Sequence, residues 1–198
     1  MVLQNLPKMF YSCDEGWPDV VRMHPTVAKM FLTYVMPMSL IPAAMFVYSM
    51  FVTPGAVFPE TVPPFTGIEA ATLFLTFYAA QLLMVPLMAS IIQQMGDVVK
   101  ARPDYQSAFM LAAIAPTPLW LGALVLFVPS VWLAGIALAV AWVASAALIY
   151  HGVEPLFQLN DHSKSRLMGS FVLTAGVVAW FALMVLLALA LSMIIGLR

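Results

Sequence analysis

Long apolar stretches separated by short polar ones dominate the pattern along this chain. Four stretches, residues 30–59, 70–96, 105–153 and 167–197, contain no Asp, Glu, Lys or Arg. A helix needs about 20 apolar residues to cross the hydrocarbon core of a bilayer, and only helices and closed barrels satisfy every backbone group there. The pattern therefore predicts membrane-spanning helices at about residues 30–52, 68–92, 107–128, 131–150 and 167–195.

The run 105–153 is divided into two spans because it is too long for one. Pro129 cannot continue the hydrogen-bond ladder of a helix, so the hairpin between these spans is placed at Val128-Pro129-Ser130. Composition agrees with this interpretation, since only 9% of the 198 residues are charged, whereas soluble domains carry about 25%. The predicted fold class is an all-α membrane protein with five transmembrane helices.

The basic residues predict the orientation of the chain in the membrane. Seven of the eight Lys and Arg residues precede span one, follow span two or follow span four, and only Arg198 lies on the opposite side. Cytoplasmic segments carry an excess of Lys and Arg, so we expect a cytoplasmic N-terminus and an external C-terminus. Four of these cations could also contact anionic lipid head groups, each contributing about 1 kcal/mol near the surface. They are Lys100, Arg102, Lys164 and Arg166, and their role as topology determinants explains them equally well.

Residues 1–29 are predicted to be a cytoplasmic segment separate from the membrane domain of residues 30–198. Apolar residues between Val2 and Cys13 fall close to one helical face, which is typical of a short helix lying on the inner membrane surface. A tail without fixed structure is the alternative. The first residues lack the pattern of a cleaved signal peptide, so we expect span one to act as the insertion signal.

Prolines inside the predicted spans point to irregular helices. They are Pro37 and Pro42 in the first span, Pro86 in the second, and Pro116 and Pro118 in the third. Each removes one backbone donor and frees a carbonyl about one turn earlier, which needs another partner inside a membrane. Two interpretations are open: broken or hinged helices that line a site, or static kinks that improve packing.

Polar side chains are rare at membrane depth. Gln81 is the only strongly polar residue near the middle of a span, and we expect it to form an interhelical hydrogen bond, for example to a carbonyl freed by a proline. Small residues four apart, such as Ala141 and Ser145, permit close packing within the bundle or with a second copy. Proton- and ion-coupled carriers normally have charged groups within their spans, so their absence here disfavours that class.

One loop holds the residues that could carry metal chemistry. His151 and Glu154 are three residues apart, and Asp161 and His162 follow in the same predicted loop. Imidazole and carboxylate suit zinc or a similar ion, but Pro155 is expected to interrupt any helix between the two pairs, and an ordinary polar loop is the alternative. We find no catalytic triad, phosphate-binding glycine loop or zinc-protease motif. The sequence thus predicts no catalytic residues, no cofactor and no enzyme.

Several short sequence motifs along the chain resemble those of bacterial Yip-domain inner-membrane proteins, over about residues 15–190. They are Glu15-Gly16-Trp17-Pro18, His24-Pro25-Thr26-Val27-Ala28, Ala115-Pro116-Thr117-Pro118 and Tyr150-His151-Gly152-Val153. The resemblance implies five helices, a cytoplasmic N-terminus and a location in the bacterial inner membrane. It implies Rab-type GTPase binding for eukaryotic members, but their acidic-Leu-Tyr-Gly-Pro word is absent here, and for bacterial members it implies no known activity.

Three functional hypotheses follow. The preferred one is a non-enzymatic scaffold or accessory subunit that binds partner membrane proteins, because catalytic groups are absent and the spans are rich in Met and aromatic residues. The second is a lipid or small-molecule transporter built on the proline-kinked first three spans around Gln81. The third is a membrane-bound metal enzyme centred on His151 and Glu154. Expected partners are membrane lipids and other integral membrane proteins or a second copy, without nucleic acid.

Overall fold

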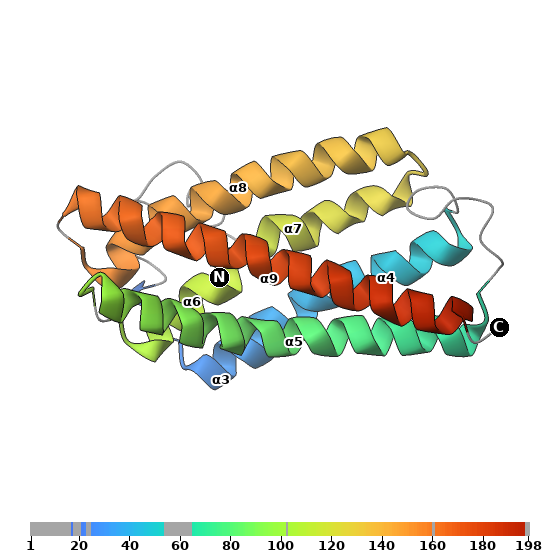
Figure 1. Ribbon diagram of the computed structural model, residues 1–198, viewed down its shortest axis with the longest axis horizontal. Helices are drawn as coiled ribbons and strands as arrows, with labels where there is room; N and C mark the ends of the chain where they lie inside the picture. The colour runs from blue at the N-terminus through green and yellow to red at the C-terminus, as the bar shows by residue number, and fades with distance from the viewer. Residues whose placement is uncertain are drawn as a thin grey trace.

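A computed structural model describes residues 17, 21–22, 25–53, 65–101, 103–159 and 161–196. Within these ranges the regular structure is helical throughout, and five helical segments are long and apolar enough to cross a membrane. They run along the long axis of the molecule (Figure 1) and comprise Val27–Phe51, Gly67–Val98, Tyr105–Phe127, Val131–Phe157 and His162–Gly196. The predicted all-α fold with five spans is confirmed.

The first and third spans are irregular. The first joins α3 (Val27–Met30), the π-helical turn η1 (Phe31–Val35) and α4 (Met36–Phe51) without a gap. The third consists of α6 (Tyr105–Ile114), α7 (Thr117–Gly122) and the 3-10 helix η2 (Ala123–Phe127). The third span is therefore interrupted between α6 and α7, whereas the role of its prolines, in a site or in packing, stays a prediction.

The other prolines inside the predicted spans lie within continuous helices. Pro37 is in the first turn of α4, Pro42 is inside α4, and Pro86 is inside α5 (Gly67–Val98). Pro116 and Pro118 differ because they stand together at the start of α7, where Pro116 is the N-cap and Pro118 lies in the first turn. Their missing N–H groups are tolerated there, because the first N–H groups of a helix have no partner within it.

Helix caps explain where α5 and α8 (Val131–Phe157) begin. Thr66 and Glu69 form a reciprocal capping box at the start of α5, with the Thr66 N–H donating to Glu69 Oε2 over 2.8 Å. Ser130 accepts from the Leu133 N–H at the start of α8. The predicted hairpin at Val128-Pro129-Ser130 is therefore confirmed, because Pro129 lies between two extended residues and Ser130 caps the next helix.

Three helix boundaries differ from the prediction. Helix α5 continues to Val98, six residues beyond the predicted end at about residue 92, and α9 (His162–Gly196) begins five residues before the predicted Leu167. Helix α8 includes Pro155 and ends two residues later at Phe157, with Gln158 as a C-cap that has a left-handed φ of 52°. Among the described residues, no helix therefore connects His151 and Glu154 with His162, which begins α9, as expected from Pro155.

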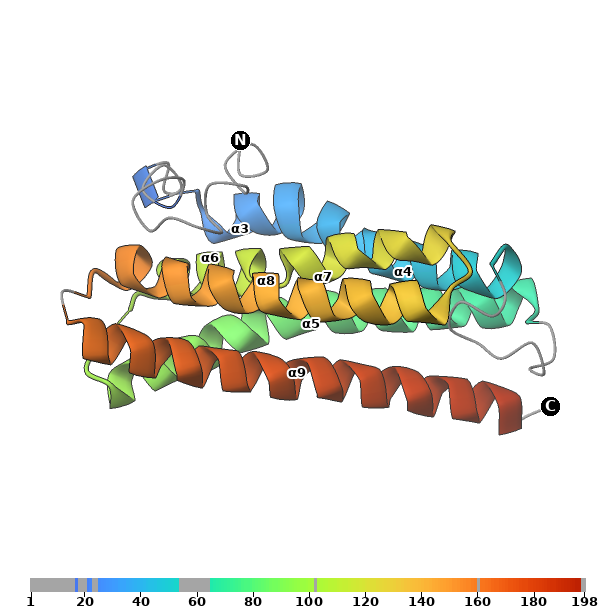
Figure 2. The same ribbon diagram turned by 90° about the horizontal axis from the view of Figure 1, so that it is seen from above.

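The bundle is built around α6, all of whose residues from Ser107 to Ile114 are buried. Figure 2 shows α9 as a separate layer along one side of the molecule, where it packs against α5 and α8. Few residues of α9 are buried, and apolar side chains cover its outer face. A membrane helix needs no polar outer face, so α8 and α9 are suited to contact with lipid.

Part of the N-terminal segment packs against the bundle. Trp17 is fully buried and belongs to the same apolar cluster as Leu111 and Val153, and Val21 packs against that cluster. The ring carbons of Trp17 occupy the space beside Gly152, where an added Cβ would come within 2.6 Å of them. The predicted surface helix between Val2 and Cys13 lies outside the described residues, and the division at residue 29 stays a prediction.

Candidate functional site

A partly open cavity of about 370 Å³ lies within the helix bundle. All five spans contribute to its wall, and the residues are apolar or aromatic with two polar exceptions. Representative lining residues are Phe46 of α4, Met88 of α5, Ala112 of α6, Trp120 of α7, Trp142 of α8 and Trp180 of α9. None of the described lining residues is Asp, Glu, Lys, Arg or His.

The two polar lining residues, Gln81 and Ser145, lie at similar depths in the membrane. Gln81 follows Gly67, the first residue of α5, by 14 positions, and Ser145 follows Val131, the first residue of α8, by 14 positions. Both helices start at the same end of the molecule (Figure 1). At 1.5 Å per residue, each side chain is about 21 Å from that end, which places both near the middle of a bilayer.

Gln81 links α5 to α4. Its side chain is only 4% exposed, and its Nε2 donates to the carbonyl of Ser39 over 3.3 Å. This is the expected interhelical hydrogen bond. Its acceptor is the Ser39 carbonyl and not the neighbouring Met38 carbonyl, which lacks a helical partner because Pro42 has no N–H. A carbonyl can only accept, so the amide nitrogen must face Ser39. The amide oxygen of Gln81 has no donor among the described residues.

Ser145 is unusual among the hydroxyl-bearing residues of the spans. It is 5% exposed, and its Oγ has no hydrogen-bond partner in the described part of the chain. Other hydroxyls bond to carbonyls of their own helix, as in Ser39 to Val35 at 2.7 Å and Thr174 to Ser170 at 2.8 Å. An unpaired buried hydroxyl costs about 1–3 kcal/mol, so a polar group of a molecule in the cavity that bonded to Ser145 Oγ would gain free energy.

An aromatic pair joins α8 and α9 at the wall of the cavity. The rings of Trp142 and Trp180 meet edge to face with centroids 5.4 Å apart. Gly176 of α9 also lines the cavity, and a Cβ added there would meet no atom within 4 Å. The wall formed by α9 therefore leaves room beside Gly176.

A buried hydrogen bond holds the irregular parts of the first and third spans together. The hydroxyls of Tyr34, in η1, and Thr117, the first residue of α7, are 2.6 Å apart. This contact fixes the break at Pro116, which with Pro42 also lines the cavity. A π-helical turn often marks a functional site, and here it lies next to the break that shapes the cavity wall.

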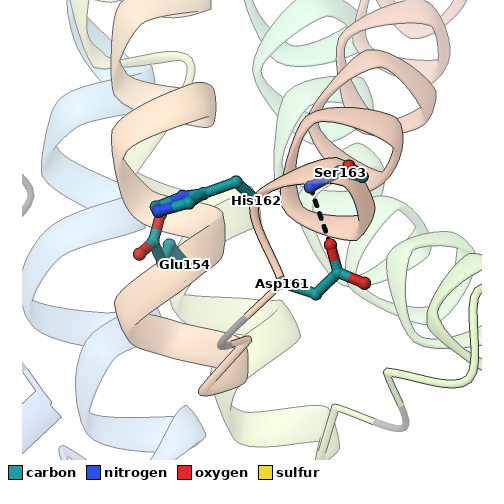
Figure 3. A network of polar contacts seen from close by, with 4 residues as sticks. All are labelled: Glu154, Asp161, His162 and Ser163. Atoms are coloured by element: carbon teal, nitrogen blue, oxygen red, sulfur yellow. Dashed lines mark hydrogen bonds and ion pairs between the residues drawn. The ribbon is translucent and has the colours of Figure 1, made fainter.

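The predicted metal candidates do not converge on one point. His151 Nδ1 lies 2.8 Å from the carbonyl of Ala147 in its own helix, whereas Glu154 Oε2 lies 3.5 Å from His162 Nδ1. Figure 3 shows Asp161 turned toward Ser163, whose N–H donates a hydrogen bond to Asp161 Oδ1 over 2.9 Å. Within the described residues, no three His, Cys, Asp or Glu side chains are grouped to hold a metal ion.

The predicted lipid-contacting cations lie at the polar ends of helices. Lys100 is exposed just beyond α5, with a left-handed φ of 59°, and Lys164 and Arg166 are exposed near the start of α9. Lys164 Nζ is 4.0 Å from Asp161 Oδ2, a solvent-exposed pair that contributes little to stability. Arg102 lies outside the described residues. Head-group binding by these residues stays a prediction.

Comparison with known proteins places the chain in a family. The model of the Yip1 domain matches residues 8–183. The chain belongs to the Yip1 domain family. It is 33% identical over 125 residues to the inner membrane protein YohC of Escherichia coli K12, and equally so to the YohC of E. coli O6:H1 strain CFT073. The match covers 63% of this chain and 60% of each relative, less than two thirds of their length. No solved structure matches the chain.

This membership confirms the resemblance seen in the short sequence motifs. With the five apolar helices, it identifies the chain as a multi-pass protein of the bacterial inner membrane. The sequence singled out Gln81 because it is polar in an apolar span. It placed Ser145 only in a small-residue pair and passed over Trp142, Gly176 and Trp180, because nothing in their spacing indicates a cavity rather than close packing.

Proposed function

We propose that this Yip1-family protein binds an acyl chain or another apolar molecule of the bilayer in its intramembrane cavity, as a lipid or small-molecule transporter would. The observation that carries the proposal is the cavity of about 370 Å³ at mid-membrane depth. The proposal extends the transporter hypothesis from the first three spans to all five, because α8 and α9 also form the wall.

The energetics of packing support an occupant. In soluble cores, an unfilled void costs about 24 cal/mol per Å³, because the atoms that line it lose contacts. Partial opening of the cavity lowers this cost, because lipid chains then reach some of the wall. An apolar molecule that fills the space restores the missing dispersion contacts, which drive association inside membranes.

The chemistry of the wall supports binding rather than catalysis. Its described residues carry no titratable group, and its volume falls at the lower end of the range of about 300–1,000 Å³ for small-molecule sites. Three of the five tryptophans line it. Such a wall recognises shape and apolar surface, as expected for a protein that takes its ligand from the hydrocarbon core.

A glycine substitution tests the proposal. Gly176→Leu adds a side chain to the cavity, where its Cβ meets no atom within 4 Å. Gly135→Leu is the matched control, because a Cβ on Gly135 of α8 also meets no atom within 4 Å and Gly135 does not line the cavity. Native mass spectrometry of protein in mild detergent should show a bound lipid or apolar molecule on the wild type and on Gly135→Leu, and severalfold less on Gly176→Leu. Equal occupancy of all three proteins would refute the proposal.

The scaffold hypothesis stays a prediction. The broad apolar surfaces of α8 and α9 could receive partner helices. Lipid contact alone accounts for the same exposed residues, such as Val143 and Phe181, because a membrane helix normally presents apolar side chains to lipid. The cavity is more specific, since lipid contact does not require it.

A further inference from the structure

We propose that the cavity prefers an uncharged single-chain amphiphile that carries a hydroxyl group, and that Ser145 recognises that hydroxyl, with Gln81 as a second polar group of the same wall. This inference rests on the proposed binding function and names the ligand class. Two observations motivate it: the unpartnered Oγ of Ser145, which is 95% buried, and the amide oxygen of Gln81, which no described residue engages.

The hydrogen-bonding capacity of the two residues fits a hydroxyl. The Gln81 oxygen can only accept, whereas the Ser145 hydroxyl can both donate and accept. An alcohol offers one donor and two lone pairs, so it can donate to or accept from the Ser145 hydroxyl, and an alcohol placed next to Gln81 can donate to the amide oxygen. An alkane satisfies neither group and would leave both polar atoms unpaired in an apolar wall.

The position and wall of the cavity exclude charged ligand groups. Both polar residues lie about 21 Å from the end of their helices, where an ion is unfavourable without a partner of opposite charge. The described lining supplies no such partner. A phospholipid keeps its charged head group at the interface, so only its acyl chain would reach this depth, and the volume of about 370 Å³ suits a smaller molecule than a whole phospholipid.

Tryptophan quenching provides the readout. Trp120, Trp142 and Trp180 line the cavity, whereas Trp132 is 86% exposed on the outer face of α8 and Trp17 is buried elsewhere. A Trp132→Phe background removes the indole that is most exposed to bulk lipid. The probes are 12-bromo-1-dodecanol and 1-bromododecane, added to phosphatidylcholine nanodiscs at equal membrane mole fractions, because bromine quenches indole on contact.

The bromoalcohol should quench at a roughly tenfold lower mole fraction than the bromoalkane, which is the discrimination that about one hydrogen bond provides. Ser145→Ala should remove most of this preference, and Ser145→Thr, which keeps a hydroxyl, should retain it. Ser90→Ala is the matched control, because the Ser90 hydroxyl already bonds to the carbonyl of Pro86 in its own helix over 3.2 Å. Gln81→Met should also weaken the preference, with thermal unfolding used to verify its fold.

The outcomes separate this inference from the function on which it rests. If both probes quench the wild type equally and Gly176→Leu abolishes quenching by both, the hydroxyl preference is overturned and the cavity-binding proposal stands. Quenching that Gly176→Leu does not change overturns both proposals. A preference for the alcohol that survives Ser145→Ala overturns the role of Ser145.

Discussion

The contact between Trp17 and Gly152 predicts that Gly152→Ala destabilises the protein. The added Cβ would come within 2.5 Å and 2.6 Å of two ring carbons of Trp17 and 3.0 Å of Leu111 Cδ1. These separations are too short for carbon atoms, and Trp17 is fully buried, so its ring has little room to move. Overpacking of this kind costs about 1–3 kcal/mol.

The matched control lies on the same helix. Gly135→Ala places a Cβ where no atom lies within 4 Å, so it changes only the helix propensity, which favours Ala by about 1 kcal/mol. The free energy of unfolding, measured by denaturant titration in mild detergent, should therefore be unchanged or higher for Gly135→Ala. It should be lower for Gly152→Ala than for Gly135→Ala by about 1–3 kcal/mol, which isolates the packing contribution.

A double-mutant cycle identifies the atoms responsible. In a Trp17→Ala background, the penalty of Gly152→Ala should fall to the small part that Leu111 causes, giving a coupling energy of about 1–2 kcal/mol. If Gly152→Ala matches Gly135→Ala, or if its penalty is the same with and without Trp17, then the Trp17 ring does not pack against Gly152.

Two further predictions concern the spans. Tyr34→Phe and Thr117→Val should each lower the free energy of unfolding by about 1–2 kcal/mol, because each leaves one buried hydroxyl unpaired. The double variant should be no less stable than either single variant, and additive losses would contradict this pairing. For the orientation, alkaline phosphatase fused after the last residue should be active outside the cytoplasm. A fluorescent protein fused before the first residue should fluoresce inside the cytoplasm, and the reverse pattern would refute the orientation predicted from the basic residues.

The number and type of the helices could be predicted because lipid imposes a simple constraint on span length and polarity. The ends were harder to predict, as Pro129 and Pro155 illustrate. Pro129 stands before a capping serine and separates two helices, whereas Pro155 lies in the last turn of α8 and is accommodated. Hydropathy also misses helical residues beyond the membrane, such as Gln94 in α5 and Lys164 in α9, because the backbone continues its ladder into water.

The polar groups of the cavity could be predicted only in part. Gln81 stands out because an amide in an apolar span needs a partner on another helix. A serine in a membrane helix normally bonds to a carbonyl of its own helix, as Ser39 and Ser170 do. Whether Ser145 does so depends on its rotamer and on the neighbours that other helices supply, which a single sequence does not reveal.

Two glycines of the cavity wall show how the sequence encodes both the fold and the cavity. A Cβ on Gly122 of α7 would lie 3.3 Å from the Cβ of Ala141, so this glycine allows α7 and α8 to approach closely. A Cβ on Gly176 would meet nothing within 4 Å, so close packing does not require a glycine there. Glycine inside a helix costs about 1 kcal/mol relative to alanine. Gly122 offsets that cost through helix contact, whereas Gly176, like Gly135, adjoins open space. Under the proposed function, a bound molecule would fill the space at Gly176, which lines the cavity, and not the space at Gly135, which does not.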